Sequence, residues 1–164
     1  METICVFLGS SVGSRKIYSD TAKDLATSII YHGYKIVFGG GNNGLMGILA
    51  DAAIAADGHI TGIITEPLNE IEVGHKGLSE LVIVQSMHER KKEMAKRSDA
   101  VICMRGGVGT WEEFFEALAW NQLGIQSKPI ILLNIEGYYD ELYFFSKKAC
   151  KEGFIPKSTL DDFY

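Results

Sequence analysis

The 164-residue sequence lacks the usual marks of nucleic-acid binding and of metal or disulfide chemistry. Its formal net charge is -5, whereas a protein that binds a phosphate backbone normally carries a basic face. The three cysteines are widely spaced and form no C-x-x-C pair, and two of them, Cys5 and Cys103, fall inside apolar runs. The four histidines show no H-E-x-x-H or comparable spacing. We therefore expect no nucleic-acid partner and no metal site.

Long apolar runs are absent as well. None approaches the roughly 20 residues needed to cross a bilayer, and the N-terminal segment METICVFLGSS has no basic region. With cysteines that suit a reducing compartment, this predicts a cytoplasmic protein with no membrane partner. We see no repeat or linker and expect residues 1–164 to form a single domain.

Short apolar runs that end in glycine alternate with longer amphipathic stretches. This rhythm is typical of βα units whose parallel sheet is buried on both faces. It predicts an α/β fold, a Rossmann-like doubly wound parallel sheet with helices on both faces. The expected strands are 4–8, 35–38, 59–64, 81–85, 100–104 and 129–133, and the expected helices are 16–31, 44–56, 87–97, 110–123 and 138–152. Residues 66–80 contain Pro67, Gly74 and Gly77, which predicts an irregular, substrate-facing loop.

Three of these strand ends carry glycine-rich or small-residue turns, at residues 9–14, 39–44 and 106–110. Without side chains the backbone approaches an anion closely, and the N–H groups of the following helix point at it. Any single turn is equally well explained by tight packing, but three together favour a phosphate. Residues 39–44 also satisfy G-x-G-x-x-G, although after the second strand, and the acidic residue expected further on would be something like Glu66. As a dinucleotide signal this is weak.

Three motifs make the chain recognisable: GGGNNGLMG at 39–47, SMHERK at 86–91 and GGVGTWEE at 106–113. In this order the sequence resembles the LONELY GUY (LOG) family of cytokinin-activating phosphoribohydrolases, long mislabelled as lysine decarboxylases. The resemblance covers nearly the whole chain. It implies a homodimeric hydrolase that needs no cofactor and cleaves N6-substituted adenosine 5'-monophosphates, or AMP, to the free base and ribose 5-phosphate.

The resemblance also implies which residues form the site. Arg90 and Glu113 match the family's catalytic pair. The matching substrate-binding positions are Gly9, Ser10, Gly40, Gly41, Gly106, Gly107, Gly109 and Thr110, with Met87 and Lys91 bordering the nucleotide. Arg105 replaces the proline that leads the family signature, and we expect a long cation beside the phosphate loop. The family's members are also expected to continue past residue 164 into another strand and helix.

The chemistry of a glycosidic bond explains why such residues are needed. Its cleavage develops positive charge on the ribose, so a carboxylate near the anomeric carbon, here Glu113, stabilises the transition state or activates water. Arg90 offers a fixed fork of donors that can orient this carboxylate. Periodicity alone favours a different interpretation, with Glu113 as a dipole-stabilising acid and Arg90 as a charge on a solvated helix face, and the family resemblance reverses this preference. Met87 is equally core filler, and Lys91 equally surface charge.

Other functions remain to be weighed against hydrolysis. The same fold also serves non-catalytic sensors or binders of nucleotide-derived signals, and Arg105 would suit such altered use. An NAD(P)-dependent oxidoreductase is disfavoured because the glycine motif is misplaced and no substrate domain remains. Large apolar residues surround more of segment 111–120 than sheet packing needs, which favours a dimer interface there.

Overall fold

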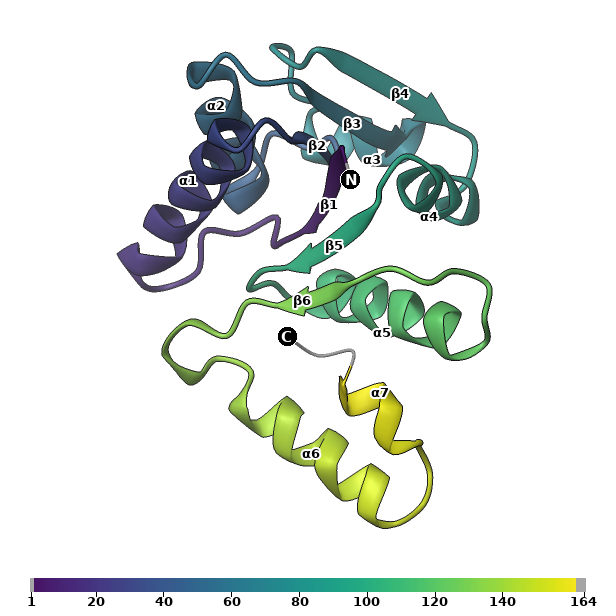
Figure 1. The fold of residues 1–164 in the computed structure, drawn as a ribbon. Coiled ribbons are helices and arrows are strands. Elements are labelled where there is room, and N and C mark those ends of the chain that lie inside the picture. Colours follow the sequence, from purple (N-terminus) through teal and green to yellow (C-terminus); the bar gives the residue numbers. More distant parts are fainter. Residues whose placement is uncertain (1, 162–164) are drawn as a thin grey trace.

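The computed structural model describes residues 2–161, which form a parallel six-stranded sheet between layers of helices (Figure 1). The strand order is β4-β3-β2-β1-β5-β6, and every neighbouring pair is parallel. The strands are β1 (Thr3–Phe7), β2 (Lys35–Phe38), β3 (Ile60–Thr65), β4 (Glu80–Val84), β5 (Ala100–Cys103) and β6 (Ile130–Leu132). The predicted fold class is confirmed, and each predicted strand agrees to within one residue at both ends.

The helices alternate with the strands as expected. They are α1 (Lys16–Tyr31), α2 (Gly44–Ala55), α3 (Glu66–Glu72), α4 (Met87–Lys96), α5 (Val108–Gln122), α6 (Asp140–Lys151) and α7 (Lys157–Asp161), with a 3-10 turn η1 (Ile135–Gly137) before α6. The five predicted helices are confirmed to within two residues at each end.

The prediction that residues 66–80 are irregular throughout is wrong, because α3 occupies the first seven of them. Pro67 does not prevent this helix, since it lies in the first turn, where a backbone N–H has no intrahelical partner. The helix ends where Val73 takes a positive φ of 51°.

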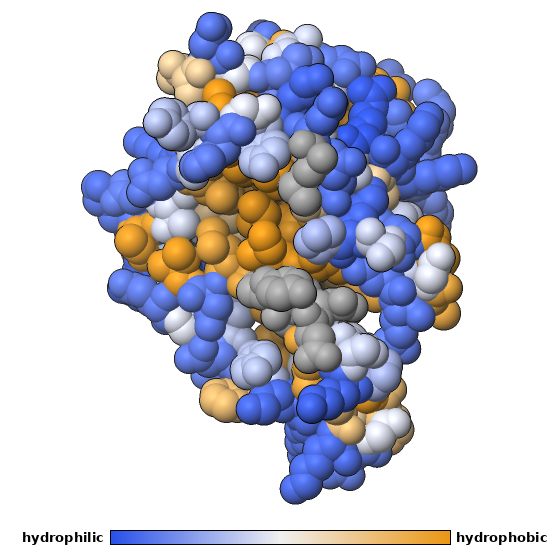
Figure 2. Space-filling view, viewed as in Figure 1, coloured by the Kyte–Doolittle hydropathy of each residue, from blue (hydrophilic) through white to orange (hydrophobic). Residues whose placement is uncertain are grey.

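The core is divided by the sheet into two halves. Along β1, Ile4 and Val6 face α1 and α2, while Cys5 and Phe7 face the other layer, which includes α4 and α5. All six residues of β3 are buried, as expected for a strand covered on both faces. Apolar side chains nevertheless gather on the surface between α1 and α6 (Figure 2). Among the described residues, no helix combines the length and apolar character needed to span a bilayer.

The strand order places a topological switch point between β1 and β5. From β1 the chain adds β2, β3 and β4 on one side, then crosses back to place β5 on the other side of β1. The turns after these two strands are joined by a hydrogen bond of 3.0 Å from the N–H of Gly9 to the carbonyl oxygen of Arg105. In doubly wound sheets, ligands bind in the crevice outside the carboxyl ends of such strands. The fold therefore points to one place for a functional site.

Candidate active site

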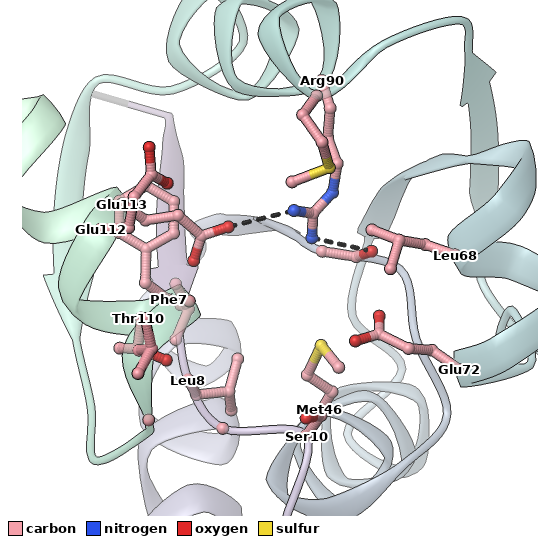
Figure 3. A pocket seen from close by; sticks show the side chains of 17 residues that line it. Phe7, Leu8, Ser10, Met46, Leu68, Glu72, Arg90, Thr110, Glu112 and Glu113 are labelled. Atoms are coloured by element: carbon pink, nitrogen blue, oxygen red, sulfur yellow. Dashed lines mark hydrogen bonds and ion pairs between the residues drawn. The ribbon is translucent and has the colours of Figure 1, made fainter.

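A cavity of about 290 Å³ opens at this switch point (Figure 3). It is near the lower end of the volumes typical of small-molecule sites. Its walls come from the turns after β1 and β2 and from helices α2 to α5. The lining residues are Val6, Phe7, Leu8, Gly9, Ser10, Gly39, Met46, Leu68, Glu72, Met87, Arg90, Gly107, Val108, Gly109, Thr110, Glu112 and Glu113.

Arg90 reaches the middle of the cavity from α4 and is held by three hydrogen bonds. Its Nε donates to the carbonyl oxygen of Ile63 at 2.8 Å and its Nη2 to that of Gly39 at 3.3 Å. Its Nη1 donates to Oε1 of Glu113 at 3.2 Å, which completes a buried ion pair. The side chain is only 6% exposed, so the alternative of a solvated charge does not hold. A side chain on Gly39 would collide with the guanidinium, which explains why glycine is needed there.

The start of α4 fixes the position of Arg90. Ser86, the N-cap, accepts a hydrogen bond from the N–H of Glu89 at 3.1 Å, and the Glu89 carboxylate accepts one from the N–H of Gln85 at 2.9 Å. Such bonds satisfy amide groups that a helix start leaves free. Met94, four residues after Arg90 and on the same helix face, is buried in the core and anchors this face against the sheet.

Glu113 approaches Arg90 from α5. Because α5 begins at Val108, two residues earlier than predicted, Glu113 lies in the second turn rather than the first. Its side chain is 11% exposed. Burial raises the pKa of this carboxyl to about 7; the Arg90 charge opposes the shift, while the negative charges of Glu112 and Glu72 add to it. A carboxyl group that titrates near neutral pH is well suited to move protons in catalysis.

The N-terminus of α5 forms the other end of the cavity. The amide groups of Val108, Gly109 and Thr110 lie in the first turn, where no intrahelical carbonyl oxygen accepts from them. Gly107, the N-cap, and Gly109 have open space where a side chain would begin, so an anion can approach the backbone. With the turn at Gly9 nearby, this end of the cavity has the properties of a phosphate site.

The structure brings most of the predicted site residues together. Those that line the cavity are Gly9, Ser10, Met87, Arg90, Gly107, Gly109, Thr110 and Glu113. Gly106 lies behind the lining, and a side chain on it would collide with that of Thr110. Gly40 and Gly41 also lie behind it, and a Cβ on Gly41 would be 2.8 Å from Cε of Met46. Each of these three glycines therefore has close neighbours at the place where a side chain would begin, and their contact with substrate stays a prediction.

Lys91, which was predicted to border the nucleotide, is not among the residues that line the cavity. Its Nζ contacts Oε1 of Glu112 at 2.5 Å and Oε1 of Glu116 at 2.9 Å, so it ties α4 to α5. Arg90 and Lys91 are adjacent on a helix and point about 100° apart, which explains why only one of them faces the cavity.

Arg105 corrects another expectation, since its side chain is not a cation beside the phosphate loop. The guanidinium lies 4.6 Å from the ring centre of Tyr18 and 5.7 Å from that of Tyr138, and it donates to the carbonyl oxygen of Ile135. Burial lowers the pKa of this group. Two aromatic faces thus hold the cation away from the cavity, and only the Arg105 backbone contacts the turn at Gly9.

Sequence reasoning missed part of the lining. Leu68 and Glu72 lie on α3, which was expected to be irregular, and Met46 comes from α2. The signal for α3 was the Glu66-Pro67 start, since proline is common in a first helical turn. Figure 3 shows Glu72 pointing into the cavity from the side opposite Thr110 and Glu113.

Fold and site together define a Rossmann-like α/β protein with a phosphate-compatible pocket and a buried acid–guanidinium pair at its switch point. A family model described as "Possible lysine decarboxylase" matches residues 46–163. The chain is 48% identical to cytokinin riboside 5'-monophosphate phosphoribohydrolase LOG5 of Arabidopsis thaliana, over 94% of this chain and 68% of the relative. The probable enzyme LOGL9 of Oryza sativa subsp. japonica shows the same identity and coverage. The chain belongs to this LOG family of phosphoribohydrolases.

A solved structure extends the comparison. The molybdenum cofactor binding protein of Rippkaea orientalis is similar with a TM-score of 0.70 and 27% identity, over 90% of this chain and 85% of that protein. The shared architecture therefore also occurs in a cofactor-binding protein.

Proposed function

We propose that this chain hydrolyses the N-glycosidic bond of adenosine 5'-monophosphates, either N6-substituted as in cytokinin nucleotides or AMP itself. The observation that carries the proposal is the buried Glu113–Arg90 pair, which shares one cavity with the N-terminus of α5. The names of the relatives in Arabidopsis and rice agree with this activity.

The reaction breaks the bond between C1' of the ribose and a nitrogen of the base. The electron pair of that bond goes to the base, and the oxygen of a water molecule bonds to C1'. A phosphate bound at residues 107–110 would place the ribose between the N-terminus of α5 and the Arg90–Glu113 pair. The Glu113 carboxylate stabilises the positive charge on the sugar and accepts the proton that water loses. The leaving nitrogen of the base takes up one proton, which balances the proton that water gives to Glu113, and ribose 5-phosphate is the second product.

Arg90 acts as a positioning residue in this proposal. Two backbone carbonyl oxygens fix its guanidinium, and the guanidinium in turn holds one carboxylate oxygen of Glu113. The second oxygen of Glu113 is left for the water or the sugar. The positive charge also keeps part of the Glu113 population ionised, because it opposes the effect of burial on the pKa.

Non-catalytic binding is the second candidate, favoured by the likeness to the molybdenum cofactor binding protein. The buried carboxyl of Glu113 argues against it. A site that only holds a phosphorylated anion gains nothing from an acid at its centre, because a carboxylate repels the anion. A hydrolase requires such a group near C1'.

Two further properties are part of the proposal. The chain acts as a homodimer, supported by exposed aromatic side chains on α5, among them Trp111 and Phe115. It works in the cytoplasm, supported by Cys5, Cys103 and Cys150, which are free in the described part of the chain.

The test is to incubate the purified protein with AMP and with an N6-prenylated AMP and to follow free base and ribose 5-phosphate by chromatography. We expect base release, and we expect Glu113→Gln to reduce it at least about 100-fold with nucleotide binding retained. Glu116→Gln is the matched control, since Glu116 lies on the same helix, forms an ion pair and does not line the cavity. Binding of either nucleotide without base release would contradict the hydrolase and favour the binder.

A further inference from the structure

Besides Glu113, two acids line the cavity, Glu72 and Glu112, and the proposed chemistry does not use Glu72. Its Oε2 is buried and has no hydrogen-bond partner among the residues that the structure describes. Burial raises the pKa of this carboxyl, and the Arg90 charge opposes the shift. A buried acceptor without a partner is costly, so such atoms are rare in folded proteins. Because Glu72 lines the ligand cavity, its carboxylate can gain hydrogen-bond partners when a ligand binds.

The surroundings of Glu72 are built to hold the carboxylate in place. The N–H of Asn42 donates to the backbone carbonyl oxygens of Glu72 at 3.1 Å and Val73 at 3.0 Å, which ties the end of α3 to the turn after β2. A Cβ on Gly41 would lie 3.0 Å from Oε2 of Glu72, so glycine at this position leaves room for the carboxylate. An antiparallel backbone bridge between Gly41 and Gly74 also joins the turn after β2 to the segment that follows α3.

The topology indicates what this acceptor binds. Strand β2, the glycine-rich turn 39–44, helix α2 and strand β3 form a βαβ unit, and Glu72 follows its second strand. In nucleotide-binding βαβ units an acidic residue after the second strand accepts a hydrogen bond from a ribose hydroxyl. The sequence suggested Glu66 for this position, but Glu66 is exposed and does not line the cavity, whereas Glu72, six residues further on, does.

We infer that the Glu72 carboxylate accepts hydrogen bonds from the ribose hydroxyls of the bound nucleotide. The inference rests on the proposed function and specifies how that site recognises the sugar. Figure 3 shows Thr110 and Glu113 on one side of the cavity and Glu72 on the other, while Arg90 enters from the top of the view, between the two sides. A ribose whose phosphate lies at the start of α5 and whose C1' faces Glu113 presents its 2'- and 3'-hydroxyls to the opposite wall. There the Glu72 carboxylate is the acceptor.

The test compares the binding of AMP, 2'-deoxy-AMP and 3'-deoxy-AMP by calorimetry, with every protein carrying Glu113→Gln to prevent turnover. With Glu72 intact, we expect AMP to bind at least about 10-fold more tightly than one or both deoxy nucleotides, as for a hydrogen bond to a charged group. Glu72→Leu should weaken AMP binding by that factor and leave the affected deoxy nucleotide unchanged. Glu72→Gln, which is isosteric and keeps one acceptor, should lose discrimination in part.

Glu66→Gln is the control, because Glu66 lies on the same short helix outside the cavity. Equal affinity for AMP and both deoxy nucleotides with Glu72 intact would overturn the inference, as would an equal loss for all three nucleotides in the Glu72 variants. If Glu72→Leu does not fold, the same comparison in Glu72→Gln decides.

The outcomes separate this inference from the proposed function. Hydroxyl-dependent binding through Glu72 without base release by the wild-type chain would refute the hydrolase and leave the sugar contact standing. Base release by the wild-type chain, with no effect of Glu72 on the preference for AMP over the deoxy nucleotides, would support the hydrolase and refute the sugar contact.

Discussion

The fold buries the Glu113 carboxyl, and the charge of Arg90 only partly offsets the effect of burial on its pKa. Its pKa rises from an ordinary value of 4.5 to about 7 because burial disfavours the charged form. Between these pH values the unfolded chain has lost this proton and the folded chain has kept it. The free energy of unfolding therefore falls as the pH rises through this range, and above pH 7 the loss is complete.

This shift predicts a pH-dependent effect of Glu113→Gln on stability. The variant carries no ionisable group at this position, so its free energy of unfolding does not fall with the ionisation of Glu113. The difference in free energy of unfolding, variant minus wild type, should therefore be about 1–3 kcal/mol larger at pH 8 than at pH 5. Urea denaturation at the two pH values measures the difference. An equal gain in Glu116→Gln, on the same helix, would show that the effect does not come from Glu113.

At the scale of single elements, the N-cap of α4 determines how firmly Arg90 is presented. Ser86→Ala removes the acceptor for the N–H of Glu89 and should lower the free energy of unfolding by about 1 kcal/mol. Ser86→Gly should cost only a few tenths of that amount, since glycine is tolerated at an N-cap. Thermal or urea denaturation distinguishes the two variants. Equal losses would mean that the side-chain bond does not stabilise the helix.

The individual elements differ in how well the sequence predicts them. Strands such as Lys35–Phe38 were predictable because a buried parallel strand reads as an apolar run that ends at glycine. Helix α3 was not, because its seven residues are too few for a periodic pattern and none of them is buried. Because α3 was not predicted, Glu72, which lies on this helix, was not predicted as a site residue either.

Within the site, the limit of sequence reasoning lies in side-chain direction. The motifs predicted Arg90 and Glu113 together, and the structure places them 3.2 Å apart. Lys91 stands in the same motif but faces Glu112 and Glu116, because neighbouring helical positions point apart. Which of the two faces the cavity depends on how α4 is rotated against the sheet, and that rotation is set by buried residues such as Met94.

At the scale of the whole molecule, the main feature is an exposed aromatic surface on α5. Trp111 and Phe115 are each more than 40% exposed, and they line a groove together with Tyr138, Leu142 and Phe145 near the start of α6. Aromatic side chains are enriched in the centres of protein interfaces.

The proposed dimer predicts a solution mass of about 36 kDa, twice the 18.1 kDa of one chain. Phe115→Glu should shift it towards 18.1 kDa, because a buried unpaired carboxylate is unfavourable in an apolar interface. Tyr31→Glu is the control, since Tyr31 is an aromatic residue that is 85% exposed on α1, away from the groove. Sedimentation velocity measures all three proteins. A wild-type chain that sediments as a monomer would contradict the dimer, whereas a dimer that Phe115→Glu leaves intact would move the interface to a different surface, such as the apolar region between α1 and α6 (Figure 2).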